Sequence, residues 1–141
     1  MIIIVQGKPI AKARPRFCRV GKGVRTYDCQ ATESGEFKLS VMAQYQGHDL
    51  LTGPIDLDVG FFLPRPKGHY GTGKNAGKVK PSAPQFPAVR PDADNYLKFV
   101  KDCLNGIVWK DDGQVVRVTA EKLYTNQTPR TVIKITELAD A

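Results

Sequence analysis

The sequence IDLDVGFFL, residues 55–63, predicts the strand around which this chain folds. Apolar side chains occupy every second position, and side chains two residues apart in a strand point to the same face of a sheet. Asp56 and Asp58 are therefore expected on the outward face of the strand. The inward face is expected to carry Ile55, Leu57, Val59, Phe61 and Leu63.

A strand and a helix are predicted before this segment. Residues 2–6 form a β-branched run that Gly7-Lys8-Pro9 ends, which is typical of a buried strand. A polar, basic loop is expected from there to about Asp28. From about residue 34 to residue 46, apolar residues recur at four-residue spacing, which predicts a helix that ends at Gly47. The buried stripe of this helix is expected to hold Phe37, Val41 and Tyr45, widened by Leu39 and Met42.

A long loop, a helix and two strands are predicted after the segment. Residues 64–90 are rich in Pro, Gly and Lys and follow neither periodicity, which indicates a loop. Residues 115–123 and 130–137 are strand-like, and the polar residues between them suggest a closing hairpin. A second helix that ends at Asn105-Gly106 is predicted from the stripe formed by Leu97, Val100, Leu104 and Ile107.

Length and composition limit the kind of protein. A chain of 141 residues with 41% apolar residues suits a single domain, residues 1–141. The predicted fold is of the α/β (α+β) class, with a mixed four-stranded sheet and two main helices in the order β-α-β-α-β-β. No run of about 18 apolar residues could cross a bilayer, and the apolar start is too short for a secretory signal, so a cytoplasmic protein without a membrane partner is expected. Three scattered cysteines and two histidines predict neither a disulfide framework nor a zinc site.

The net charge of +7 is unevenly distributed. Residues 1–27 and 59–91 contain thirteen of the 21 basic residues and no acidic residue, so the rest of the chain is net negative. One basic run is usually a solvated face, but two of them in a small domain favour contacts with phosphates. The candidate DNA-binding residues lie in basic loops at about 8–27 and 64–90: Lys8, Lys12, Arg14, Arg16, Lys67, Lys74, Lys78, Lys80 and Arg90.

Three aspartates stand out against this basic background. Asp92 and Asp94 precede the second predicted helix, and Asp112 lies in the turn that follows it. Gathered carboxylates would repel a polyanion unless a hard divalent cation lay between them, so we expect Mg²⁺, for which Mn²⁺ can substitute. In an extended segment, residues two apart are about 6.5 Å apart and can share one ion. Asp94 is then expected at or near the helix N-cap, with Lys98 one turn further on the same face.

Each of these residues also has an ordinary interpretation. Aspartate is a preferred N-cap residue, and Asp112-Gly113 is a common turn sequence. Lys98 could form surface ion pairs with Asp94 and Asp102 that are worth about 0.3 to 0.5 kcal/mol. Spacing alone does not separate the role of Asp111 from that of Asp112. The sequence GTGK at residues 71–74 lacks the pattern of a P-loop, so no nucleotide cofactor is expected.

The motifs taken together resemble the RusA family of Holliday junction resolvases. They are GKP at 7–9, KARPR at 12–16, RPDADNYLK at 90–98, DCLNG at 102–106 and DDGQV at 111–115. The resemblance implies a homodimeric, magnesium-dependent endonuclease that cuts four-way DNA junctions in recombination and repair. By motif, the catalytic carboxylates fall on Asp92, Asp94 and Asp112, and the catalytic lysine on Lys98.

The resulting hypothesis is a metal site in which the three carboxylates converge from the start of the second helix and the turn beyond its end. If each chain provides one site, symmetric cuts on two strands require a twofold dimer. Two alternatives remain at this point. A noncatalytic nucleic-acid-binding protein would share the basic loops, and a metal-dependent enzyme for a small phosphorylated substrate would share the aspartates but need an enclosed pocket.

Overall fold

A four-stranded mixed sheet is the centre of the computed structural model, which describes residues 1–13, 16–20, 23–27 and 30–139. Its strands, in spatial order, are β1 (Ile2–Gln6), β6 (Arg130–Glu137), β4 (Ile55–Pro64) and β5 (Val115–Thr125). β4 pairs antiparallel with β6 and parallel with β5, and β1 pairs antiparallel with β6. The segment IDLDVGFFL therefore lies inside the sheet, as a central strand.

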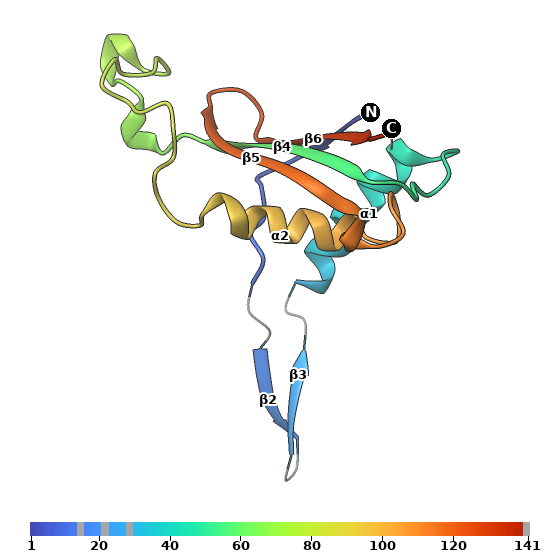
Figure 1. Ribbon diagram of the computed structural model, residues 1–141. Coiled ribbons are helices and arrows are strands. Elements are labelled where there is room, and N and C mark those ends of the chain that lie inside the picture. Colours follow the sequence, from blue (N-terminus) through green and yellow to red (C-terminus); the bar gives the residue numbers. More distant parts are fainter. Residues whose placement is uncertain (14–15, 21–22, 28–29, 140–141) are drawn as a thin grey trace.

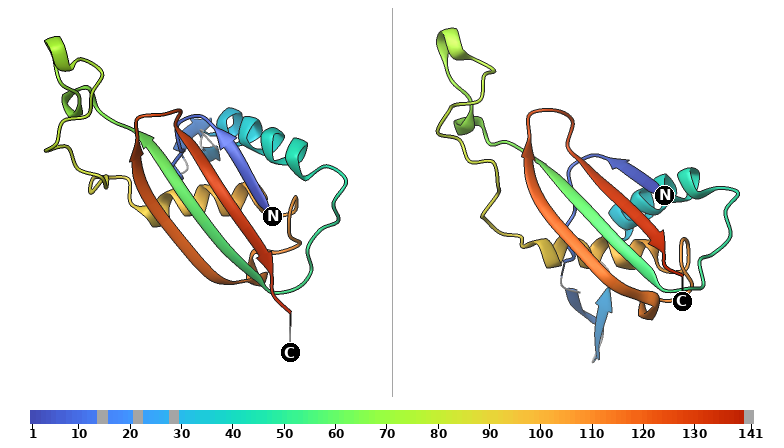
Figure 2. Two further views of the ribbon diagram at one scale, coloured as in Figure 1. Left: turned by 90° about the horizontal axis from the view of Figure 1, so that it is seen from above. Right: turned by 45° about the horizontal axis from the view of Figure 1, so that its top comes forward.

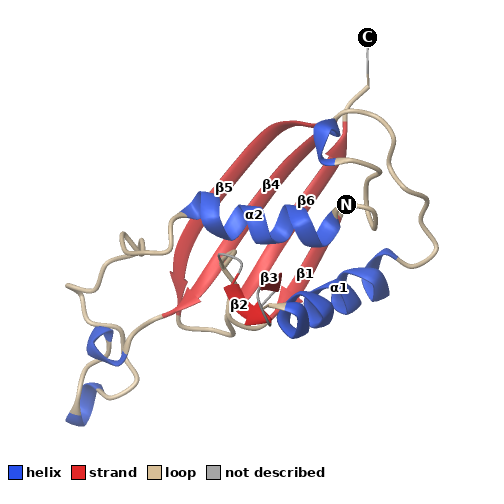
Figure 3. Cartoon of the chain, turned by 90° about the horizontal axis from the view of Figure 1, so that it is seen from below, coloured by secondary structure: helices blue, strands red, loops and turns tan. Residues whose placement is uncertain are grey.

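Two helices, α1 (Ala31–Tyr45) and α2 (Ala93–Leu104), cover one face of the sheet and leave the other face open. Figure 2 shows the open face in front of both helices, and Figure 3 shows the opposite side, with α2 lying across the sheet. The predicted fold class is confirmed, as is the order of the four sheet strands and two helices. No helix in the described part of the chain is long and apolar enough to span a membrane.

The core lies between the sheet and the helices. All five residues predicted for the inward face of β4 are buried, and Asp58 is exposed. In α1, Phe37, Val41 and Tyr45 are buried as predicted. Leu39 and Met42 are 67% and 51% exposed, so the prediction of a wider stripe is wrong. The reason is geometric, since Leu39 lies two residues from both Phe37 and Val41 and points about 200° away from them around the helix.

Helix α2 ends as the sequence predicted. Leu97, Val100 and Leu104 are buried, and Gly106 follows with a φ of +79°, a left-handed conformation that glycine adopts without strain. Ile107 is half-buried and lies beyond the helix end. The C-terminal boundary of α2 therefore follows from the Asn-Gly sequence.

The basic segment after β1 is not the loop that was predicted. It contains a separate antiparallel pair, β2 (Arg16–Val20) and β3 (Gly23–Tyr27), which projects from the helical side of the body (Figure 1). The sequences of both strands contain β-branched and aromatic residues, which favour strands, and the basic residues among them concealed this pattern.

The predicted closing hairpin is also wrong. β5 and β6 are consecutive in sequence, but β4 lies between them in the sheet. β4 and β5 are parallel, and the connection between two parallel strands must cross over the sheet, which helix α2 does here. β5 thereby pairs with one edge of β4. The other edge of β4 is then open to β6, which reaches it through the short connection that follows Thr125.

The long segment between β4 and α2 forms a lobe beyond the end of the sheet (Figures 1 and 2). It contains two short 3-10 turns, η1 (Lys67–His69) and η2 (Gly73–Asn75). The returning part of the segment is held by Arg65, whose Nη1 donates to the Pro84 carbonyl at 2.6 Å, and by the Tyr124 N–H, which donates to the Gln85 carbonyl at 3.1 Å. The lobe is therefore anchored at its base.

Candidate active site

Asp92 is the N-cap of α2. Its backbone is extended, with φ −77° and ψ 167°, and its Oδ1 accepts a hydrogen bond from the Asn95 N–H at 2.9 Å. The helix therefore begins at Ala93, and Asp94 lies in its first turn, near the N-cap as predicted. The cap uses one oxygen of Asp92, so the side chain can cap the helix and still offer Oδ2 to a ligand.

Asp94 and Lys98 lie on one face of the first two turns of α2. Lys98 Nζ is 3.2 Å from Asp94 Oδ2, and both side chains are exposed. They line a shallow hollow of about 660 Å³ together with Arg90, Pro91, Asp92 and Asn95. The hollow thus combines two carboxylates and two cations at the end of a helix where the dipole favours negative charge.

Asp111 and Asp112 have different partners, which the sequence could not show. Asp111 closes its own turn, because its side chain accepts from the Gly113 N–H at 2.9 Å and its N–H donates to Gln114 Oε1 at 2.7 Å. A Cβ at Gly113 would come within 2.8 Å of Asp111 Oδ2, so a larger residue there would displace the Asp111 carboxylate. Asp112 Oδ1 instead accepts from Nε1 of the buried Trp109 at 2.9 Å. Sequence reasoning missed Trp109, although its position three residues before Asp112 was a usable signal.

The structure does not bring the three predicted carboxylates together within one chain. No group of three or more acidic, histidine or cysteine side chains that could hold an ion exists among the described residues. Asp92 and Asp94 are at the start of α2 and Asp112 lies beyond its end (Figure 3), and a helix of 12 residues is about 18 Å long. The expected convergence within a single chain is therefore not met.

The donor atoms nevertheless suit a hard cation. Each of Asp92, Asp94 and Asp112 has one oxygen in a protein contact and a second oxygen that this contact does not use. Carboxylate oxygens are the protein ligands that Mg²⁺ and Mn²⁺ prefer, usually one or two of them with several waters. The three residues are of the type that binds such an ion, but within one chain only Asp92 and Asp94 line the same hollow.

The first basic segment begins beside α2. The Lys12 N–H donates to the Asn95 carbonyl at 3.0 Å, and Lys12 Nζ is 2.9 Å from Asp102 Oδ2. Asp102 thus pairs with Lys12 and not with Lys98, as one interpretation of the sequence had it. Lys8 is exposed. Arg14 lies outside the described residues, and for Arg16 only the backbone is described, as the first residue of β2.

The second basic segment supplies the lobe. Lys67 and Lys74 lie in the 3-10 turns, Lys78 and Lys80 follow them, and all four side chains are exposed. Arg90 lies at the other end of the segment, in the hollow at the start of α2. The β2–β3 pair projects from the helical side of the body and the lobe from the end of the sheet nearest the start of α2 (Figure 1). Among the predicted basic residues whose side chains are described, only Arg90 lines the hollow, while Lys67, Lys74, Lys78 and Lys80 lie in the lobe.

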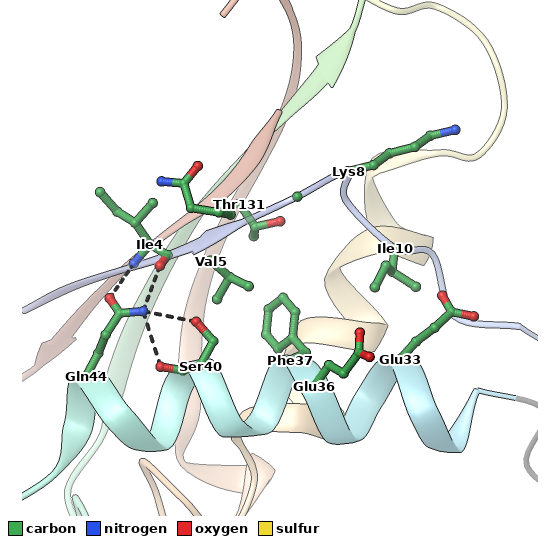
Figure 4. A pocket seen from close by; sticks show the side chains of 12 residues that line it. Ile4, Val5, Lys8, Ile10, Glu33, Glu36, Phe37, Ser40, Gln44 and Thr131 are labelled. Carbon is green, nitrogen blue, oxygen red and sulfur yellow. Dashed lines mark hydrogen bonds between the residues drawn. The ribbon is translucent and has the colours of Figure 1, made fainter. Parts of the chain in front are cut away.

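A second hollow, of about 520 Å³, lies between β1 and α1 (Figure 4). Gln44 bridges the two elements there, because it accepts from the Ile4 N–H at 3.0 Å and donates to the Ile4 carbonyl at 2.7 Å. In this way Gln44 occupies the free edge of β1. Glu33 and Glu36 line this hollow with Lys8 as its single cation, whereas two cations, Arg90 and Lys98, accompany the two carboxylates of the hollow at the start of α2. The chemistry is therefore assigned to the hollow at the start of α2.

Comparison with known proteins identifies the class to which this fold and site belong. The sequence model of the family described as "Endodeoxyribonuclease RusA" matches residues 6–136. A protein of Bacillus subtilis (strain 168), named "Uncharacterized protein YqaN", is 34% identical over 136 residues, which cover 96% of this chain and 94% of that protein. The chain belongs to the RusA endodeoxyribonuclease family, a family of nucleases that act on branched DNA.

Proposed function

We propose that this protein is a structure-selective endonuclease that resolves Holliday junctions by paired, metal-dependent cuts in DNA recombination and repair. The observation that carries the proposal is the placement of Asp92, Asp94 and Lys98 on one hollow in a chain of this family. Arg90 and Lys98 supply positive charge in that hollow, and the lobe adds exposed lysines that phosphates can contact. Phosphate contacts of this kind fix the position of DNA with little dependence on base sequence.

The roles of the site residues follow from their chemistry. Asp92 and Asp94, with Asp112, would hold Mg²⁺ or Mn²⁺. When bound, such an ion neutralises charge on the scissile phosphate and lowers the pKa of water. Lys98 is close enough to Asp94 to keep that carboxylate oriented, and its ammonium group lies at the hollow where a phosphate would approach. Hydrolysis in this arrangement would leave a 5′-phosphate and a 3′-hydroxyl.

A twofold dimer would complete the carboxylate set. If the α2 helices of two subunits lie antiparallel, the end of one helix comes next to the start of the other, and Asp112 of the partner subunit can reach the hollow. Val116 and Val118 are 63% and 41% exposed on β5, an edge strand that begins directly after the turn Asp112–Gln114. Exposed apolar side chains beside a split site favour a contact between subunits at this place.

The alternatives are less well supported. Asp92 and Asp94 are exposed, and their hollow is shallow, whereas an enzyme for a small phosphorylated substrate needs an enclosed pocket. A protein that only binds nucleic acid would gain nothing from the carboxylates that line the hollow, since they repel phosphate.

The Asp94→Asn variant tests the proposal, with Asp58→Asn on the open face of the sheet as a matched control. Asp94→Asn removes a metal ligand and keeps the shape of the side chain. We expect it to bind a synthetic four-way junction in a gel-shift assay and to lose Mg²⁺-dependent cleavage, whereas Asp58→Asn cuts normally. Undiminished cleavage by Asp94→Asn would remove that residue from the mechanism.

A further inference from the structure

Lys122 makes a contact that the proposed mechanism does not yet use. Its Nζ donates to the carbonyl of Val89 at 2.7 Å and to the carbonyl of Pro91 at 2.8 Å. The side chain is half-buried, and both acceptors belong to the backbone directly before Asp92. This lysine therefore binds the main chain of its own protein, whereas most of the other lysines that the structure describes are exposed.

The position of Lys122 in the sheet explains how it reaches this segment. Lys122 in β5 is the register partner of Phe61 in β4, whose side chain is buried in the core. Register partners point to the same face of a sheet, so Lys122 rises from the sheet toward the start of α2. The rest of the returning segment is held further from the site, at Pro84 and Gln85. Lys122 is thus the described anchor nearest to Asp92.

Asp92 consequently lies between two fixed points. On one side the Pro91 carbonyl is bound to Lys122, and on the other side Oδ1 of Asp92 is bound to the Asn95 N–H. Hydrogen bonds in which the donor is charged are stronger than neutral ones, which suits Lys122 to fix a segment that has no regular secondary structure. Without this anchor, the hydrogen bonds described for residues 89–92 would be those at the start of α2 alone.

We propose that Lys122 is a positioning residue for the metal site, which holds the backbone before Asp92 so that Asp92 and Asp94 face the hollow together before any ion or DNA binds. The role in metal binding rests on the proposed metal-dependent function. The claim that Lys122 fixes the backbone before Asp92 rests on its two hydrogen bonds alone. Residues that orient metal ligands in this way typically contribute about 10- to 100-fold in metal affinity or activity.

The first test needs neither metal nor DNA. Lys122→Met keeps the length and the apolar stem of the side chain and removes the donors, and Lys134→Met removes one lysine from the exposed, open face of β6 as a control. We expect hydrogen exchange of the Asn95 amide to become several-fold faster in Lys122→Met and to stay unchanged in Lys134→Met. Amides of β4 should be unaffected in both variants. An unchanged Asn95 exchange rate in Lys122→Met would overturn the inference.

The second test measures binding of Mn²⁺ by electron paramagnetic resonance and the Mg²⁺ concentration that gives half-maximal junction cleavage. In Lys122→Met, the dissociation constant for Mn²⁺ and the Mg²⁺ concentration for half-maximal cleavage are both expected to rise about tenfold. Junction affinity without metal should stay unchanged. Lys122→Arg, which keeps a charged donor, should recover most of the loss. A role in stability alone would lower the melting temperature and the cleavage rate at every Mg²⁺ concentration without a shift in either constant, which would refute the inference.

The two proposals fail in distinguishable ways. If the unchanged protein does not cut junctions with Mg²⁺ or Mn²⁺, the proposed function fails, while the exchange of the Asn95 amide still decides whether Lys122 positions Asp92. If the unchanged protein cuts junctions and Lys122→Met has the same metal dependence, the positioning role is wrong and the proposed function remains.

Discussion

Mixing two inactive variants should restore activity if the metal site is shared between subunits. Asp94→Asn alters the start of α2, and Asp112→Asn alters the turn beyond its end. The helix between them is about 18 Å long, so in one chain these residues lie too far apart to hold one ion. In a mixed dimer with shared sites, both substitutions fall in the same site and the other site contains neither.

The size of the recovery follows from the symmetry. Random exchange makes about half of the dimers mixed, and each mixed dimer has one intact site of two, so about one quarter of all sites should be active. One active site can nick but not resolve. On a plasmid with an extruded cruciform we therefore expect nicked circles, whereas the unchanged protein gives linear DNA.

Subunit exchange is verified by native mass spectrometry with one of the two variants labelled with ¹⁵N, because the unlabelled variants have the same mass. A mixture of Asp92→Asn with Asp94→Asn is the matched control, because both substitutions lie at the same end of α2 and no mixed dimer has an intact site. If exchange is complete and the first mixture nicks no more than the control, the shared site is refuted.

Three further predictions concern the site, the lobe and the core. Trp109→Phe keeps an aromatic ring in the core but leaves Asp112 without its indole donor, so cleavage should fall about tenfold with unchanged junction affinity, and an equal rate would contradict this. Changing both Lys78 and Lys80 to glutamine should weaken junction binding at every DNA sequence. Measured by fluorescence anisotropy, the slope of log affinity against log salt concentration should become shallower by about 2. An unchanged slope would exclude both lysines from phosphate contact. Burial, together with two nearby carboxylates, raises the pKa of Tyr45 above its usual value of 10.0. As pH rises above 10.0, the tyrosine therefore ionises first in the unfolded chain, and the free energy of unfolding falls. In urea unfolding, Tyr45→Phe should flatten this fall, and an equally steep fall would refute the assignment.

In the central strand, local pattern predicted which residues are buried but not which strands are neighbours. The alternation in residues 55–63 identified all five buried residues of β4, because the two-residue period depends only on the strand itself. The neighbours of β4 depend on long-range pairing, and the four residues between β5 and β6 are compatible with a hairpin or with a connection across β4. Local pattern could not decide between these two topologies.

For the site too, local sequence predicted the residues that are close in the chain but not the long-range contacts. Asp92, Asp94 and Lys98 are close in sequence, so an extended segment for the two aspartates and helix geometry for Asp94 and Lys98 predicted that they gather at one end of α2. Lys122 is 31 positions from Pro91, and no periodicity connects them. The separation of Asp112 from the other two carboxylates required the observed length of α2 and the position of the turn beyond it.

The most direct test of the account compares a synthetic four-way junction with a linear duplex of the same sequence, each incubated with the protein in Mg²⁺ and in a chelator. We predict paired, symmetric cuts with 5′-phosphate ends in the junction strands, in Mg²⁺ only, and little cleavage of the duplex. A junction that is bound but stays intact in both Mg²⁺ and Mn²⁺ would contradict the central claim.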